Sequence, residues 1–221
     1  MKFTMFFMCV LLSIGFVSGI YAITDDFDDG NDDGWTQIQG VWSVQNGEYV
    51  QEDTEWASTD TNETYHRSYF GDESWENYTL EAKIRIEQSG DLAPIIGIFF
   101  RVTEKSASGD YYYFRLDTRP AEGPALIKSP NTILLENMEK PAVVGQDYIL
   151  KVDVSGNNIK CYIDGQLEIE LQDDSFSMGA VGVGTFNTDG YFDDVIVSGG
   201  DVVSAVSTGG KLATTWASIK N

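Results

Sequence analysis

Cysteine, histidine and basic residues are all scarce in this chain. Its 221 residues include two cysteines, one histidine and five prolines, and 14 Lys plus Arg stand against 35 acids. So few Cys and His residues exclude a disulfide framework and a zinc centre built from them. The formal net charge of -21 repels phosphate, so we expect no nucleic-acid partner. His66 lies in a polar stretch, and we expect it to be exposed.

Long apolar runs are also absent after residue 22. The one such run, Phe3 to Val17, follows Lys2 and leads to small residues that end at Ala22, which is typical of a secretory signal peptide. We therefore expect residues 1–22 to be removed. The mature protein is then secreted, extracellular or periplasmic, with no membrane association after cleavage.

The remaining chain lacks any segment of ten or more residues with a helical period. It shows short segments of alternating polar and apolar residues instead, and each ends at a Gly, Asn or Asp turn such as Asn46-Gly47, Ser155–Asn158, Asp164-Gly165 or, between the last two strands, Thr188–Gly190. This pattern predicts an all-β sandwich. We expect one domain over 23–199 and a tail over 200–221. Cys161 alternates with isoleucines, which predicts a buried side chain.

Three consecutive segments, 76–88, 93–105 and 110–118, show the clearest alternation. If they pair within one sheet, one face is apolar and the opposite face carries arginines and aromatic rings. The candidate ligand-binding residues on that opposite face are Arg85, Phe99, Arg101, Tyr111, Tyr113 and Arg115, with Lys128 extending the set.

Several motifs carry a resemblance over residues 25–198. They are Asp26-Phe-Asp-Asp-Gly with a following Gly-Trp, Tyr78-Thr-Leu-Glu-Ala-Lys, Gly97-Ile-Phe-Phe-Arg, Tyr111-Tyr-Tyr-Phe-Arg-Leu, Tyr148-Ile-Leu-Lys-Val-Asp-Val, Tyr162-Ile-Asp-Gly and Phe192-Asp-Asp-Val. In this order they resemble the concanavalin A-like lectin/glucanase superfamily, in particular laminin-G-like domains and the 3-keto-disaccharide hydrolase type domain. The resemblance implies a jelly-roll β-sandwich of two curved antiparallel sheets, whose concave face commonly binds carbohydrate.

The positions of the acidic residues in the sequence do not favour a catalytic function. Glucanases of that superfamily carry alternating acids on one strand, and no segment expected on the concave face has them. Glu168 and Glu170 do alternate, but they lie in a hairpin whose outer face is solvated. We therefore expect a non-catalytic, lectin-like carbohydrate-binding module. The alternatives are a sugar hydrolase of the 3-keto-disaccharide type and a protein-binding adhesion module.

The arginine and aromatic side chains suggest which ligand the concave face takes. Aromatic rings contact the C–H groups of a sugar, and arginine donates to hydroxyls or carboxylates. A positive patch on an acidic protein predicts a glycan ligand and favours one with anionic groups, and we expect the protein to act as a monomer. The alternative is a solvated sheet face whose arginines pair with acids and tyrosines across strands.

Acidic residues at both ends of the domain suggest a metal. In a jelly roll the first and last strands lie close together, which would bring Asp26, Asp28 and Asp194 near each other. In similar carbohydrate-binding sandwiches a structural Ca²⁺ links these ends, and carboxylates are the ligands that it prefers. The alternative is turn chemistry, because Asp is common in turns.

Overall fold

The structure is a computed structural model that describes residues 21–54, 65–89, 93–138, 140–199 and 202, so nearly all of the predicted tail and all of the predicted signal peptide except Tyr21 and Ala22 lie outside the described residues. The described part holds fifteen strands and no helix long and apolar enough to cross a membrane. The strands are β1 (Tyr21–Asp25), β2 (Thr36–Gln39), β3 (Trp42–Gln45), β4 (Glu48–Gln51), β5 (His66–Phe70), β6 (Tyr78–Ser89), β7 (Ile95–Val102), β8 (Tyr112–Asp117), β9 (Ala125–Lys128), β10 (Thr132–Glu136), β11 (Asp147–Ser155), β12 (Asn158–Ile163), β13 (Gln166–Gln172), β14 (Ala180–Phe186) and β15 (Thr188–Gly199).

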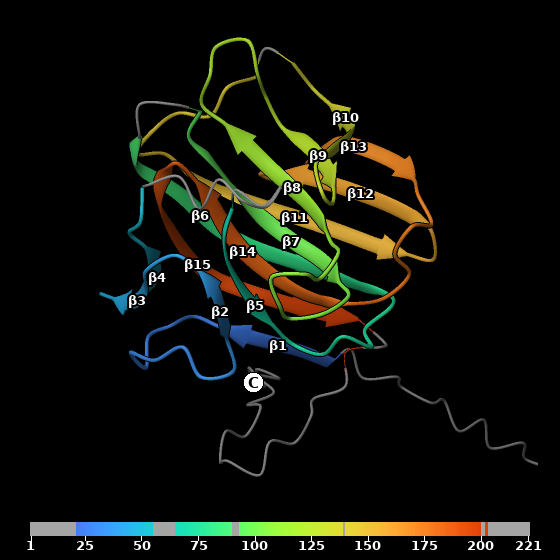
Figure 1. The fold of residues 1–221 in the computed structure, drawn as a ribbon, viewed down its shortest axis with the longest axis horizontal. Helices are drawn as coiled ribbons and strands as arrows, with labels where there is room; N and C mark the ends of the chain where they lie inside the picture. The colour runs from blue at the N-terminus through green and yellow to red at the C-terminus, as the bar shows by residue number, and fades with distance from the viewer. Residues whose placement is uncertain (1–20, 55–64, 90–92, 139, 200–201, 203–221) are drawn as a thin grey trace, which may run out of the picture.

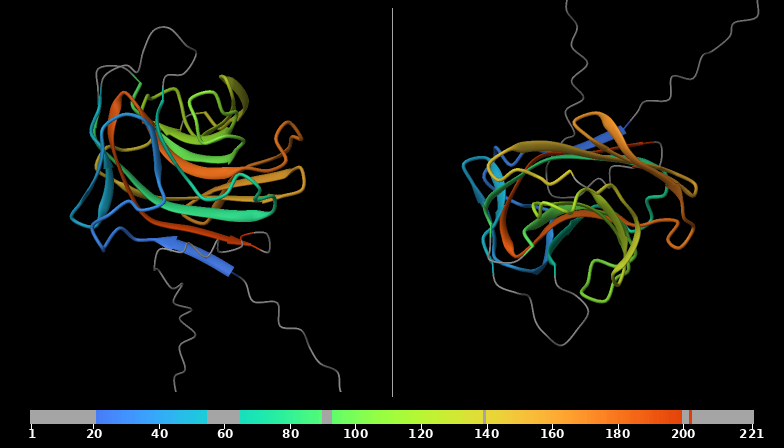
Figure 2. Two further views of the ribbon diagram at one scale, coloured as in Figure 1. Left: turned by 60° about the horizontal axis from the view of Figure 1, so that its bottom comes forward. Right: turned by 90° about the horizontal axis from the view of Figure 1, so that it is seen from above.

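These strands form two antiparallel sheets that lie face to face (Figure 1). Sheet A has the order β13-β12-β11-β6-β15-β4-β3, with β1 paired to β15, and sheet B has the order β10-β9-β8-β7-β14-β5-β2. Both layers curve in the same sense and sheet B lies on the inside of the curve, so its outer face is the concave one (Figure 2, right). The predicted two-sheet jelly-roll is confirmed.

The main core fills the space between the sheets. Alternate residues of β6, β7, β8, β11, β14 and β15 supply it, and members such as Ile98, Phe114 and Val152 are fully buried. Cys161 belongs to this core, as its alternation with isoleucines predicted. A second apolar cluster covers the outer face of sheet B and includes Phe99 and Tyr113.

Two sequence predictions about the strands were wrong. The segment that forms β6 lies in sheet A, whereas β7 and β8 lie in sheet B, so the chain crosses between sheets after β6 instead of turning back beside it. The last two strands were expected to turn at residues 188–190. The turn is instead at Asn187, which has a φ of 54°, and there the chain crosses from β14 in sheet B to β15 in sheet A.

Candidate functional site on the outer face of sheet B

Strand alternation places one predicted group of residues on the outer face of sheet B. Tyr111, Tyr113 and Arg115 point to this face, because the residues between them, such as Phe114, belong to the main core. Phe99 on β7 lies directly opposite Tyr113 on β8, and the two rings stack with centroids 4.1 Å apart. The structure therefore brings these four predicted residues together.

Two glycines on neighbouring strands leave room for these rings against the sheet. Gly97 and Gly184 are cross-strand partners in the middle of sheet B. A β-carbon on Gly97 would lie 2.9 Å from the Tyr113 ring, and one on Gly184 would lie 2.7 Å from the Phe99 ring. The Tyr113 hydroxyl donates to the carbonyl of Gly184 at 2.9 Å. The rings are thus fixed against the sheet and are fully buried.

Strand β5 adds two residues that the sequence analysis did not place on this face. Arg67 and Tyr69 alternate with core-facing residues, and both are fully buried. Arg67 donates to the Tyr69 hydroxyl at 3.2 Å, and its guanidinium lies 5.4 Å from the centre of the Tyr111 ring. Alternation was the only sequence signal for this strand. It was not visible in His66–Phe70, because both faces of the strand carry polar residues.

Charged groups gather at the end of this face where β8 and β10 finish. We call this the charged end, and it consists of Arg115, Asp117, Arg119, Glu122 and Glu136. Buried Asp117 accepts hydrogen bonds from Arg115 Nη1 and from Arg119 Nη2, both at 2.6 Å. Arg115 Nη2 lies 3.8 Å from a Glu136 carboxylate oxygen. Arg115 therefore lies between two acids.

The two acids beside Arg115 have opposite pKa shifts. Burial alone would raise the pKa of Asp117, but the hydrogen bonds from Arg119 and Arg115 outweigh it and hold the pKa below its usual value. Burial and the neighbouring carboxylate of Glu122 raise the pKa of Glu136. One carboxyl group is thus held ionised, while the other keeps a proton to higher pH.

Aromatic rings border the charged end on its inner side. Tyr65 lies with its ring centre 4.7 Å from that of Tyr113 and 6.1 Å from that of Phe186. Burial raises the pKa of Tyr65, so its hydroxyl stays protonated at neutral pH and can donate a hydrogen bond. The side chains of Arg119 and Glu122 reach solvent, with exposed fractions of 44% and 26%. Solvent therefore reaches this face at the charged end.

Arg101 does not lie on this face, contrary to the sequence prediction. The register of β7 against β14 shifts between Ala180 and Gly182, and Arg101 has a φ of 50°. This bulge reverses the side to which Arg101 points. Its guanidinium is buried and donates to three backbone carbonyls, those of Phe176 at 2.9 Å, Glu76 at 3.4 Å and Gly156.

Lys128 also points away from the predicted face. It is the cross-strand partner of Tyr112, whose ring belongs to the main core. Its ammonium donates to Asp173 at 3.2 Å and to Ser175 at 2.8 Å. Lys128 therefore holds the connection between β13 and β14 and does not extend the aromatic face.

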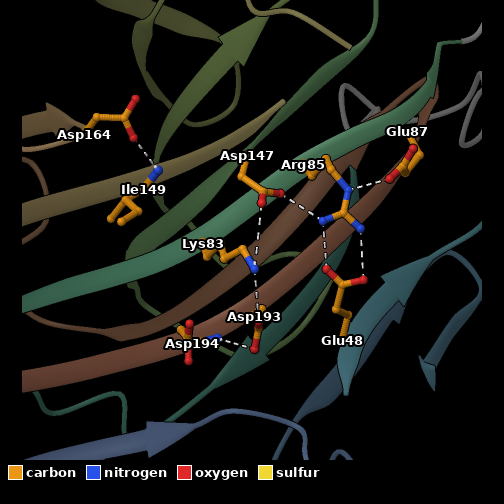
Figure 3. A network of polar contacts seen from close by, with 9 residues as sticks. All are labelled: Glu48, Lys83, Arg85, Glu87, Asp147, Ile149, Asp164, Asp193 and Asp194. Atoms are coloured by element: carbon orange, nitrogen blue, oxygen red, sulfur yellow. Dashed lines mark hydrogen bonds and ion pairs between the residues drawn. The ribbon is translucent and has the colours of Figure 1, made fainter. Parts of the chain in front are cut away.

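Arg85 lies on the outer face of sheet A, because β6 belongs to that sheet. Figure 3 shows it between Glu48, Glu87 and Asp147, with Nη1 2.8 Å from Asp147 and 2.9 Å from Glu48. Its guanidinium also lies 4.9 Å from the centre of the Tyr191 ring. Cross-strand pairing thus accounts for Arg85, as the alternative of a solvated sheet face expected.

The proposed calcium ligands lie where the first and last strands meet. β1 pairs with β15, and Asp25 is opposite Val195. Partial burial and the charges of Asp193, Asp26 and Asp28 raise the pKa of Asp194, so these acids lie near each other. Among the described residues, no group of three or more His, Cys, Asp or Glu side chains is arranged to hold a metal ion. The calcium site stays a prediction.

His66 is buried, contrary to the prediction that it is exposed. Its Nδ1 lies 3.0 Å from the Gln51 amide nitrogen, and its Nε2 lies 3.6 Å from Asp53. Burial lowers the pKa of His66 despite the nearby Asp53. His66 points to the inner side of β5, so it does not contact the charged end.

The carbohydrate-binding module CBM66 from Bacillus subtilis has the same fold, with a TM-score of 0.63, 22% identity, and coverage of 75% of this chain and 96% of that one. A β-glucanase from Bacillus licheniformis gives a TM-score of 0.55 at 13% identity, covering 80% and 97% of the two chains. The fold is thus that of concanavalin A-like glucanases and carbohydrate-binding modules.

The chain belongs to the family described as 3-keto-alpha-glucoside-1,2-lyase-like domains, whose model matches residues 22–197. The resemblance found in the sequence is therefore confirmed. An extracellular exo-alpha-L-arabinofuranosidase from Streptomyces chartreusis is 30% identical over 153 residues, which are 67% of this chain. The chain spans only 17% of that relative's length.

Proposed function

We propose that this protein is a secreted module that binds a carbohydrate at the charged end of sheet B without catalysing a reaction. The observation that carries the proposal is the pair Arg115 and Arg119 held on Asp117 beside the rings of Tyr65 and Phe186. Fixed hydrogen-bonding groups next to aromatic rings are what a sugar needs, since it offers hydroxyls at its rim and C–H groups on its faces. The similarity to a carbohydrate-binding module and to part of an extracellular enzyme supports both the ligand class and the location.

The charge of the ligand follows from the charges around Arg115. The sequence suggested an anionic glycan, because several of the few basic residues of this acidic chain were expected to share one sheet face. In the structure the two guanidinium groups of the charged end face three carboxyl groups. An incoming carboxylate or sulfate would find these arginines already paired, so we propose a neutral sugar.

Replacing Arg119 tests the proposal, because its side chain is 44% exposed and buried Asp117 keeps its hydrogen bond from Arg115 without it. Binding to a panel of neutral and acidic oligosaccharides is measured for the wild type, for Arg119→Ala and for Lys160→Ala. Lys160 is a matched control, because it is an exposed cation paired with Glu170 on sheet A. We expect Arg119→Ala to weaken binding about tenfold, the loss of one charged hydrogen bond, and Lys160→Ala to leave it unchanged. Equal binding by all three proteins would contradict the proposal.

A sugar hydrolase is the second candidate, and the opposite pKa shifts of Asp117 and Glu136 favour it. Acid–base cleavage needs one protonated and one ionised carboxyl group near the scissile bond. Incubation of the protein with the panel, followed by chromatography of the products, tests this candidate. Product release by the wild type that is abolished in Glu136→Gln would favour the hydrolase over the binding module.

A further inference from the structure

A cavity opens at the side of the sandwich where β10 and β13 are the edge strands of the two sheets. Its volume is about 280 Å³. The wall comes from both sheets and from the β10–β11 connection, and its apolar part consists of Leu116, Pro124, Pro141, Ala142, Tyr148 and Ile163. Because an apolar cavity of about 150 Å³ is enough to hold benzene, this one has room for an aromatic ring.

A bulge aims the carboxyl group of Glu168 at this cavity. The register of β13 against β12 shifts between Cys161 and Tyr162, and Glu168 is the extra residue of β13 at that point. Its side chain lines the cavity and is only 7% exposed. The carboxylate accepts hydrogen bonds from Asn137 at 2.7 Å and from Lys140 at 2.7 and 3.0 Å. Since a carboxylate accepts about four hydrogen bonds, Glu168 can take one more donor.

Exposed apolar side chains are concentrated in the segment that borders the cavity. We call them the apolar border, and they are 42–56% exposed: Ile133, Leu135, Met138, Val143 and Val144. Only four other large apolar side chains are exposed elsewhere in the described part of the chain. The same segment supplies Lys140, Pro141 and Ala142 to the cavity wall. An exposed apolar surface that surrounds a cavity is typical of a protein interface.

We infer that this cavity binds a tyrosine side chain of a basic protein partner, with the apolar border as the surrounding contact surface. Tyrosine offers a ring to the apolar wall and a hydroxyl that donates to Glu168, whereas phenylalanine offers the ring alone. The formal charge of -21 attracts a basic partner. A second copy of this chain has the same charge and is repelled. The site is separate from the charged end, so the inference goes beyond the proposed function.

Capped tripeptides test the inference on the whole protein. Lys-Tyr-Lys, Lys-Phe-Lys and Glu-Tyr-Glu are titrated into isotope-labelled protein, and amide chemical shifts report both affinity and location. We expect Lys-Tyr-Lys to shift the amides of Ala142, Tyr148 and Gln166, which line the cavity. Lys-Phe-Lys should bind about tenfold more weakly, the loss of one hydrogen bond to a charged group. Glu-Tyr-Glu should bind more weakly than Lys-Tyr-Lys at low salt, and added salt should narrow that difference.

Two exposed valines provide matched variants. Val143 and Val41 are 56% and 57% exposed, but only Val143 belongs to the apolar border. Val143→Ser should weaken all three peptides by the same factor, and Val41→Ser should leave their affinity unchanged. In Glu168→Gln the one amide oxygen is taken by Asn137 and Lys140, so the preference for Lys-Tyr-Lys over Lys-Phe-Lys should fall below about threefold. This ratio is measured within one variant, so a loss of stability does not imitate it.

Several outcomes would overturn the inference. They are no shifts with any peptide, shifts away from the cavity, equal affinity of the wild type for Lys-Tyr-Lys and Lys-Phe-Lys, or equal behaviour of Val143→Ser and Val41→Ser. A dimer in analytical ultracentrifugation that Val143→Ser dissociates would also overturn it, because a second copy would then cover the apolar border. Arg119→Ala separates this site from the glycan site, since it should lose glycan affinity and keep its affinity for the peptides. Failure of the glycan panel therefore leaves the docking site standing, and failure of the peptides leaves the glycan site standing.

Discussion

Arg101 stabilises one end of the sandwich from a backbone conformation that arginine seldom adopts. Its φ of 50° lies in the left-handed region, and that conformation turns the guanidinium toward three carbonyls from separate loops. Its backbone amide also donates to the Tyr78 hydroxyl at 2.7 Å. One side chain therefore fixes the connections before β6, between β11 and β12, and before β14.

A conservative replacement of Arg101 should therefore be costly. Lysine has a single ammonium that cannot reach all three carbonyls, and buried acceptors without a donor destabilise a fold. We expect Arg101→Lys to lower the free energy of unfolding by about 2–4 kcal/mol in urea titrations. Lys160→Arg, at an exposed position where the cation pairs with exposed Glu170, is the control and should leave the free energy of unfolding unchanged. Similar values for both variants would show that the three bonds contribute little.

Asp194 should make stability depend on pH. Its pKa is raised in the folded protein by partial burial and by Asp193, Asp26 and Asp28. The folded state thus holds this proton more tightly, so the stabilisation is present at low pH and is lost as pH rises through the folded pKa. In chelator at pH 7 we expect Asp194→Asn to melt about 1–2 °C higher than the wild type, with the difference vanishing near pH 3.

The same variant tests the calcium prediction. If Ca²⁺ binds at Asp194, Asp26 and Asp28, added calcium must raise the melting temperature of the wild type and have a much smaller effect on Asp194→Asn. An equal response of both proteins to calcium, or no response, would count against this site. Asparagine tolerates the left-handed backbone at this position, where φ is 47°. The substitution therefore adds no backbone strain that would change the melting temperature.

At the scale of elements, sheet B depends on glycines that leave room for rings. A β-carbon on Gly97 would lie against the Phe114 carbonyl and 2.9 Å from the Tyr113 ring. We expect Gly97→Ala to lower the free energy of unfolding by about 1–3 kcal/mol, the usual cost of overpacking. Near-UV circular dichroism should also change, because the Tyr113–Phe99 stack must shift. A variant of wild-type stability with an unchanged spectrum would contradict this account.

The alternation of polar and apolar residues predicted which face of the sheet each side chain points to, but not which strands pair with each other. The period of two correctly placed Phe99, Tyr113 and Arg115 together, because the hydrophobic core fixes which side points inward. It could not show that β6 joins the other sheet, since a connection of a few residues can either turn back or cross. It failed for Arg101, because one extra residue in a bulge reverses every side chain after it.

The site itself was less predictable than the strands. Asp117 and Arg115 follow from alternation on β8, but Glu136 belongs to an edge strand that meets them only through β9. Arg67 lies in a stretch whose apolar pattern is weak. Contacts between segments far apart in the chain build the charged end, and a single sequence carries no direct signal for such contacts.

At the scale of the whole molecule, net charge separates a neutral ligand from an anionic one. The chain carries a formal charge of -21, so an anionic glycan is repelled until salt screens the field. For a neutral glycan we expect the dissociation constant to change less than about twofold between roughly 50 and 500 mM NaCl. Affinity for an acidic glycan that exceeds that for its neutral counterpart at low salt would contradict our assignment.

The pairing of β1 with β15 also decides how the molecule would bear mechanical load. Ile23, where the expected mature chain begins, lies opposite Val197, so both ends of the sandwich leave at one place, near the start of β6 and the bulge at Arg101 (Figure 1). The charged end lies at the other end of the strands. Tension between a bound glycan and an anchor at either chain end would run parallel to the strands. Many backbone hydrogen bonds would then resist it together in shear.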